Sequence, residues 1–134
     1  MRIRPPSKTR LLDAAERLML AKGFVATSVE EICKAAKLTK GSFFHYFASK
    51  EQLGREVLER FCAASFRRMQ AGVAKESDPL KRVVGYVEGA ISMAKACIQE
   101  RGCLLGTFAL EFSEANPRMR SACAKAFDEW AGML

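Results

Sequence analysis

The chain has 134 residues, of which 49% are hydrophobic and 28% charged, a composition typical of a globular domain and unlike that of disordered or low-complexity chains. No apolar run approaches the roughly 20 residues that a membrane-spanning helix needs, and no apolar stretch follows the basic start, so we expect a cytoplasmic protein without membrane contact. The net charge is +7, and residues 1–70 carry all of it, with 14 Lys and Arg against 7 Asp and Glu. Such an excess favours a nucleic-acid or anionic partner, and a solvated basic face is the alternative.

The first two predicted helices cover residues 8–22, with Ser7 as the cap of the first, and residues 29–36. Apolar residues recur at helical spacing along the first segment, and Gly23 provides its stop. The second segment opens with Ser28-x-x-Glu31, which is the pattern of a capping box. Both helices therefore have apolar faces for a shared core.

A third short helix is predicted over residues 40–47, with Thr39 as its cap. A fourth, longer helix opens with Ser49-x-x-Gln52 and runs to about residue 70. A polar connector over residues 72–78 follows, and it is the best candidate for a boundary between subregions. Three further helices are predicted, over residues 79–100, 103–113 and 117–134.

Residues 28–47 have the spacing of a helix-turn-helix, in which the second helix enters the DNA major groove. Leu38 lies in the turn, and the second helix opens with small and polar residues that let its backbone approach a duplex. The hydroxyl of Thr39 and the ammonium groups of Lys40 and Lys50 can bind phosphates. Two short helices joined by a tight turn also occur in bundles that do not bind DNA.

Three sequence segments resemble the N-terminal domain of TetR-type transcriptional repressors. They are Gly23-Phe24, residues 27–32 (TSVEEI) and, above all, residues 40–53 (KGSFFHYFASKEQL). The resemblance covers about residues 8–58. It implies an all-α fold, with a three-helix DNA-binding domain followed by a helical ligand-binding and dimerisation domain. It also implies an inducer that weakens operator binding.

The resemblance implies DNA contacts from Thr27, Ser28, Thr39, Lys40, Gly41, Ser42, Phe44, His45, Tyr46 and Lys50. Either Thr27 or Ser28 would hold a phosphate, and Lys50 would hold another beside the fourth helix. Phe44 stands where the family usually has Tyr. Without a hydroxyl, a contact there can only be apolar, for instance with a thymine methyl group.

The C-terminal half resembles the sixth-helix region of one subgroup of the family, through residues 102–106 (GCLLG) and 109–111 (ALE). Some members of that subgroup respond to electrophiles or oxidants through cysteine, so Cys103 is a candidate sensor thiol, and a small buried apolar cysteine is the alternative. The remaining four cysteines form no CxxC pair and are expected to be free. The candidate ligand pocket consists of Tyr86, Met93, Cys97, Cys103, Phe108, Phe112 and Trp130.

We therefore expect a DNA-binding domain over residues 1–52 and a helical ligand-binding and dimerisation region over residues 53–134. That region looks incomplete, because the family usually continues with further helices that build most of the dimer interface. The expected function is operator binding as a homodimer, relieved by a small-molecule, electrophile or redox signal. The alternative is a non-enzymatic adaptor that binds a protein through the C-terminal apolar face around Trp130. No enzymatic site, metal or cofactor is expected, since phosphate loops, triads and ligand clusters are missing from the sequence.

Overall fold

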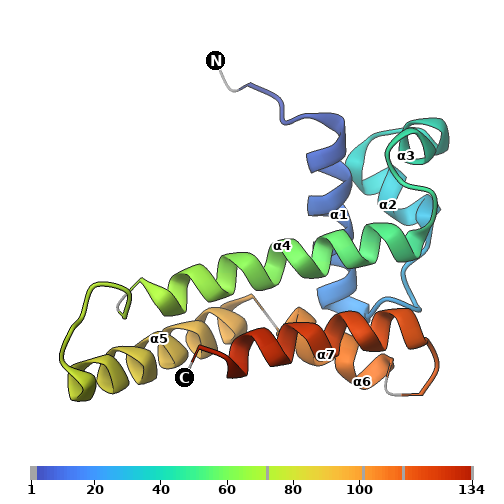
Figure 1. The fold of residues 1–134 in the computed structure, drawn as a ribbon. Coiled ribbons are helices and arrows are strands. Elements are labelled where there is room, and N and C mark those ends of the chain that lie inside the picture. Colours follow the sequence, from blue (N-terminus) through green and yellow to red (C-terminus); the bar gives the residue numbers. More distant parts are fainter. Residues whose placement is uncertain (1–2, 72, 101, 113, 134) are drawn as a thin grey trace.

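The computed structural model describes residues 3–71, 73–100, 102–112 and 114–133, and these form an all-helical structure without strands (Figure 1). Its helices are α1 (Ser7–Lys22), α2 (Val29–Ala36), α3 (Lys40–Tyr46), α4 (Lys50–Gln70), α5 (Pro79–Gln99), α6 (Leu104–Glu111) and α7 (Pro117–Ala131). The predicted order of seven helices is confirmed. Arg101 and the C-terminal residue Leu134 lie outside the described residues.

Helices α1, α2 and α3 cluster at one end of the molecule, against the start of α4 (Figure 1). Their shared core contains Leu11 of α1, Ile32 of α2 and Phe43 of α3, each with no exposed surface. Phe47, which follows α3, is also buried. The cluster is a small three-helix unit whose apolar faces point inward, as their helical spacing predicts.

Side-chain caps set the starts of α2, α3, α4 and α5 where the sequence predicts them. The predicted Ser7 cap of α1 is wrong, because the helix begins at Ser7 itself and Pro6 occupies the N-cap position, where it forms no side-chain hydrogen bond. Ser28 forms the full capping box with Glu31 at the start of α2. Thr39 and Ser49 accept the backbone N–H three residues further on, at the starts of α3 and α4. Asp78 caps α5 in the same manner. These contacts are local in sequence, which is why the pattern alone predicts them.

Helix α4 leaves the three-helix unit and serves as the surface on which α5, α6 and α7 pack (Figure 1). A polar contact joins the start of α4 to the start of α7, because the Asn116 amide donates to Glu51 at 2.9 Å. The Asn116 side chain also accepts the N–H of Met119 and so caps α7. The N-terminal unit is thus tied to the C-terminal helices through α4.

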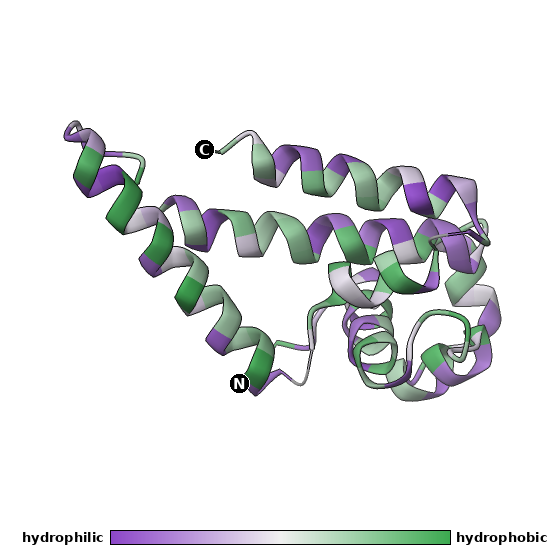
Figure 2. Cartoon of the chain, turned by 90° about the horizontal axis from the view of Figure 1, so that it is seen from below, coloured by the Kyte–Doolittle hydropathy of each residue, from purple (hydrophilic) through white to green (hydrophobic). Residues whose placement is uncertain are grey.

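Helix α5 differs from its neighbours because none of its residues is buried. It packs against α4 and leaves apolar side chains exposed on its other faces (Figure 2). The exposed apolar residues of α5 are Leu80, Val83, Val84, Val87, Ile91 and Ile98.

The predicted extension of the last helix to residue 134 is wrong within the described part, since α7 ends at Ala131 and Gly132 follows as its C-cap. Met119, Cys123 and Ala126 form its buried face. No helix in the described ranges combines the length and the apolar character that a bilayer span requires.

Candidate nucleic-acid interface

Helices α2 and α3 form the predicted helix-turn-helix (Figure 1). Helix α2 ends at Lys37, which has a left-handed backbone conformation with φ 56°. The N–H of Leu38 then donates to the carbonyl oxygen of Cys33 at 2.9 Å, and the Leu38 side chain packs against the core. The turn therefore closes with satisfied backbone groups and an apolar plug between the two helices.

The outer surface of α3 carries most of the side chains expected at DNA. The residues Thr39, Lys40, Gly41, Phe44 and His45 are exposed, whereas Ser42 and Tyr46 are half-buried. Phe43 lies on the opposite side with no exposed surface, and it holds the exposed Phe44 ring edge-on at 5.1 Å. The anchoring of one face in the core leaves the other face free to meet a partner.

The first residue of α3 is paired with an acid of α2. Lys40 Nζ lies 2.5 Å from Glu30 Oε1. The hydrogen bond with Lys40 lowers the pKa of Glu30, and the same bond raises the pKa of Lys40. Both side chains are exposed, so a phosphate can compete with Glu30 for the ammonium group.

Arg10 contacts the helix-turn-helix, although no sequence pattern indicated this residue. Its guanidinium, from α1, donates to the carbonyl oxygens of Ala36 and Lys37 at the end of α2. A cation at the carboxyl end of a helix stabilises the helix dipole. The contact spans 26 and 27 positions in the sequence, so no local pattern reveals it.

Thr27 is not available for the predicted phosphate contact. Its side chain is completely buried, and its hydroxyl donates to the carbonyl oxygen of Gly23 at 2.7 Å. Of the two alternatives for this contact, only Ser28 reaches the surface, where its hydroxyl takes part in the α2 capping box. Burial of Thr27 follows from the turn between α1 and α2, which folds its side chain back onto Gly23.

Lys50 points inward from the start of α4. Its ammonium group donates to the carbonyl oxygens of Phe24 at 3.1 Å and Thr27 at 3.0 Å. It also lies 4.4 Å from the centre of the Phe24 ring, in a cation–π arrangement. The residue expected to hold a phosphate is therefore engaged with the segment between α1 and α2.

The residues expected to line a ligand pocket do not meet in one cavity of the described structure. Phe108 and Phe112 are buried and pack edge-on against each other at 5.5 Å, which makes them part of the core. Tyr86 lines a shallow hollow with Arg82 and Met133, whereas Met93 and Cys97 line a different one beside Arg60.

Trp130 is half-buried near the end of α7, where its ring lies 6.4 Å from that of Phe127. Its indole N–H is buried and finds no acceptor within the described ranges. Trp130 lines neither of the two hollows that contain Tyr86, Met93 and Cys97.

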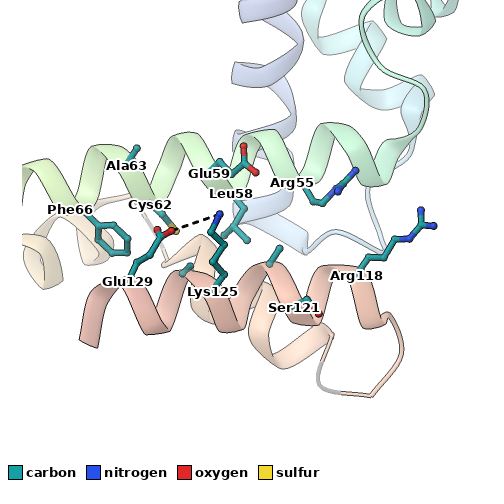
Figure 3. Close-up of a pocket in the computed structure, with 12 residues that line it drawn as sticks. Arg55, Leu58, Glu59, Cys62, Ala63, Phe66, Arg118, Ser121, Lys125 and Glu129 are labelled. Carbon is teal, nitrogen blue, oxygen red and sulfur yellow. Dashed lines mark ion pairs between the residues drawn. The ribbon is translucent and has the colours of Figure 1, made fainter. Parts of the chain in front are cut away.

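A further hollow of about 380 Å³ lies between α4 and α7 (Figure 3). Lys125 and Glu129, one turn apart on α7, line it and form an ion pair at 3.9 Å (Figure 3). Cations Arg55 and Arg118 lie at one end of it. None of the expected pocket residues lines this hollow.

Cys103 is half-buried and forms the N-cap position of α6. Burial raises the pKa of Cys97, and the neighbouring Cys103 thiol, which hydrogen-bonds with it, raises that pKa further. The structure thus brings the two thiols together. Burial raises the pKa of Cys33 and Cys123 as well, and it raises that of Cys62 to about 12.

Comparison with known proteins adds independent findings to this geometry. Residues 11–57 match the family described as bacterial regulatory proteins, tetR family, and residues 79–134 match the C-terminal domain described as transcriptional regulator LmrA/YxaF-like. The HTH-type transcriptional repressor DhaR of Mycobacterium sp. (strain GP1) is 29% identical over 128 residues, which cover 95% of this chain and 63% of DhaR. The HTH-type transcriptional repressor NemR of Escherichia coli K12 is 33% identical over 123 residues, which cover 89% of this chain and 60% of NemR.

A solved structure of similar fold is the regulatory protein TetR from Rhodobacter sphaeroides. It superposes with a TM-score of 0.75 at 29% identity, over 92% of this chain and 66% of that one. This chain therefore spans less than two thirds of the length of DhaR and of NemR.

Proposed function

Because the chain belongs to the TetR family of bacterial regulatory proteins, we propose that it is a sequence-specific DNA-binding transcriptional repressor. The observation that carries the proposal is the helix-turn-helix of α2 and α3, whose outer surface is exposed and lies in the basic half of the chain. Repressors named for this motif, DhaR and NemR, support the same reading. The proposal assigns no catalytic reaction.

The proposed DNA contacts come from one continuous surface. They are Ser28, Thr39, Lys40, Gly41, Ser42, Phe44, His45 and Tyr46. Phosphate contacts from Lys40 and Ser28 would position the unit, and the side chains of α3 would read base edges in the major groove. The lone histidine, His45, is exposed and stacks edge-on with Tyr46 at 4.8 Å, which leaves its ring accessible to a base or phosphate.

We also propose that the two parts of the chain have different functions. Residues 1–52 would bind DNA, and residues 53–134 would belong to a helical region for ligand binding and dimerisation. In this proposal two copies bind a pseudo-palindromic operator in the cytoplasm. A small-molecule, electrophile or redox signal releases them, with Cys103 as the candidate sensor thiol.

A selection from a random duplex pool at physiological salt tests the proposal. We expect enrichment of an inverted-repeat site, because a two-fold dimer reads two equivalent half-sites. Affinity for that site should fall steeply with salt, since phosphate neutralisation supplies much of the binding free energy.

The matched control is the Ser42→Ala variant, which should retain the salt dependence but enrich a less restricted set of sites. Binding that merely follows the salt concentration, with no site enriched, would contradict the proposal and favour a protein adaptor instead. Enrichment of a single half-site would contradict dimeric binding but not sequence-specific DNA binding.

A further inference from the structure

The segment between α1 and α2, residues 23–28, is held from the C-terminal side by one carboxylate. Glu111, the last residue of α6, accepts the backbone N–H of Phe24 through Oε2 at 2.7 Å. Its Oε1 accepts the N–H of Val25 at the longer distance of 3.5 Å. These contacts join residues 86 and 87 positions apart, and they connect the C-terminal helices directly to the DNA-binding unit.

Helix α6 itself does not explain a carboxylate at this position. Glu111 lies at the carboxyl end of the helix, where the helix dipole disfavours negative charge. The last turn contains no basic residue that would offset it. The two backbone N–H groups of the 23–28 segment supply the favourable interaction that α6 lacks, so the acid is explained by tertiary structure.

Gly23 shows how closely this carboxylate approaches the backbone. Its φ is 88°, a conformation that residues with a Cβ rarely adopt. A Cβ at this position would also collide with the Glu111 carboxylate, lying 2.9 Å from Cδ. Glycine is therefore favoured here by its backbone conformation, and a side chain in its place would displace the Glu111 carboxylate.

Residues 23–28 are contacted by side chains from both α6 and α4. The Phe24 ring packs edge-on against Phe108 at 5.8 Å and Phe112 at 5.0 Å, at the end of the chain segment that carries Glu111. From the other side, the Lys50 ammonium donates to the carbonyl oxygens of Phe24 and Thr27. A carboxylate thus accepts the N–H groups of this segment, an ammonium donates to its carbonyl groups, and its aromatic ring packs on α6 and on the residue that follows it.

We propose that Glu111 is a positioning residue, which links α6 to the helix-turn-helix through the backbone of residues 23–28. Ser28, the N-cap of α2, follows Val25 by three residues, so a displacement of the carboxylate moves the start of α2. Glu111 thereby sets the orientation of α2 and α3 relative to α4, α6 and α7. The expected effect of Glu111 on DNA affinity rests on the proposed operator binding. The contact between Glu111 and residues 23–28 does not.

The test compares Glu111→Ala, Glu111→Gln and the control Glu114→Ala, in which an exposed acid of the α6–α7 turn is removed. Hydrogen exchange at the Phe24 and Val25 amides should accelerate at least about tenfold in Glu111→Ala, because a charge-assisted acceptor is lost. Exchange should change much less in Glu111→Gln, whose amide oxygen still accepts, and not at all in Glu114→Ala.

Measurements of DNA affinity distinguish a loss of positioning from a loss of folding. In Glu111→Ala, affinity for the selected operator should fall about tenfold, while affinity for a scrambled duplex of equal length at low salt stays within about twofold of wild type. An unfolded variant would lose both, and Glu111→Gln then decides, since it keeps an acceptor and should retain operator binding.

Two results overturn the proposal. One is unchanged exchange at Phe24 and Val25 in Glu111→Ala, which would remove the link. The other is faster exchange with unchanged operator affinity, which would remove its positioning effect. If the wild-type chain prefers no operator, the proposed function has failed, and the exchange comparison alone then confirms or overturns the link.

Discussion

Lys50 shows at the level of one residue how a cation expected at DNA can have partners within the fold. Its position in the family motif implies a phosphate contact, yet two of its three N–H donors go to the carbonyl oxygens of Phe24 and Thr27. An ammonium group with three donors retains one for another partner. Its principal contact in this structure is therefore internal, and its removal acts on the fold before it acts on DNA.

Replacement of Lys50 by Met should lower the free energy of unfolding by about 2 kcal/mol, because two carbonyl groups of the α1–α2 segment lose a charged donor. The control is Lys34→Met, which removes the same charge from an exposed position on α2. Urea denaturation at neutral pH measures both. Equal midpoints for the two variants would show that the internal contacts of Lys50 contribute nothing to stability.

Thr27 and Ser28 illustrate the same point with two adjacent hydroxyl groups. The sequence makes them equivalent candidates for a phosphate contact. In the structure one is fully buried on Gly23 and the other caps α2 at the surface. The direction in which the chain turns after α1 distinguishes them, and the residue types do not.

At the level of helices, the caps explain why the predicted boundaries are so close to those observed. The Ser28–Glu31 box at α2 is reinforced by Lys22 of α1, whose ammonium lies 2.5 Å from the Glu31 carboxylate. The hydrogen bond from Lys22 and then that from the Ser28 backbone lower the pKa of Glu31 from its ordinary value to about 2. The start of α2, the first helix of the helix-turn-helix, is thus held by a charged carboxylate.

This lowered pKa predicts a specific dependence of stability on pH. Since the folded pKa of Glu31 lies below its unfolded value, its contribution is fully present above about pH 4.5 and is lost as the pH falls toward 2. Glu31→Gln should therefore be less stable than wild type at pH 6, and the difference should vanish near pH 2. Urea midpoints across this range measure it, and a constant difference would contradict the role of the charge.

For the C-terminal half, the sequence predicts the positions of the helices better than the contacts of their side chains. Aromatic residues at helical spacing suggested a pocket, but Phe108 and Phe112 are packed against Phe24 of the N-terminal unit. Helix α5 was expected to contribute Tyr86 and Met93 to that pocket. Its residues face two different hollows instead, because α5 packs against α4.

At the level of the whole molecule, the charge excess and the candidate sensor thiols lie in different halves. Residues 1–70 carry the net +7 and the helix-turn-helix, whereas Cys97 and Cys103 lie at the connection of α5 and α6. A signal received at these thiols can reach DNA only through the packed helices. The contacts of Phe24 with α6 and of Lys50 with the Phe24 carbonyl provide one continuous route.

Alkylation by N-ethylmaleimide checks whether Cys103 receives such a signal. The reagent forms a carbon–sulfur bond at Sγ, and the thiol proton is transferred to the neighbouring carbon of the maleimide ring. One equivalent should weaken operator affinity about tenfold in the wild type, a magnitude typical of allosteric coupling. Burial raises the pKa of Cys62 to about 12 and keeps its thiol protonated, which disfavours reaction there.

Cys103→Ser is the matched variant and should retain its operator affinity after the same treatment. Mass spectrometry of digested protein locates the adduct. An equal loss of affinity in both proteins, or an adduct on Cys103 without loss, would exclude this cysteine as the sensor.

The sequence by itself determined the helices, their caps, the helix-turn-helix and the family. Those features depend on residues within a few positions of one another, such as Ser28 with Glu31 or Thr39 with Ser42, so their patterns can be recognised in one dimension. Only the tertiary structure decided that Thr27 is buried, that Lys50 turns inward and that Glu111 holds the Phe24 N–H. Each of these outcomes depends on the path of the chain between α1 and α2 and, for Lys50 and Glu111, on groups brought together across 23 to 87 positions.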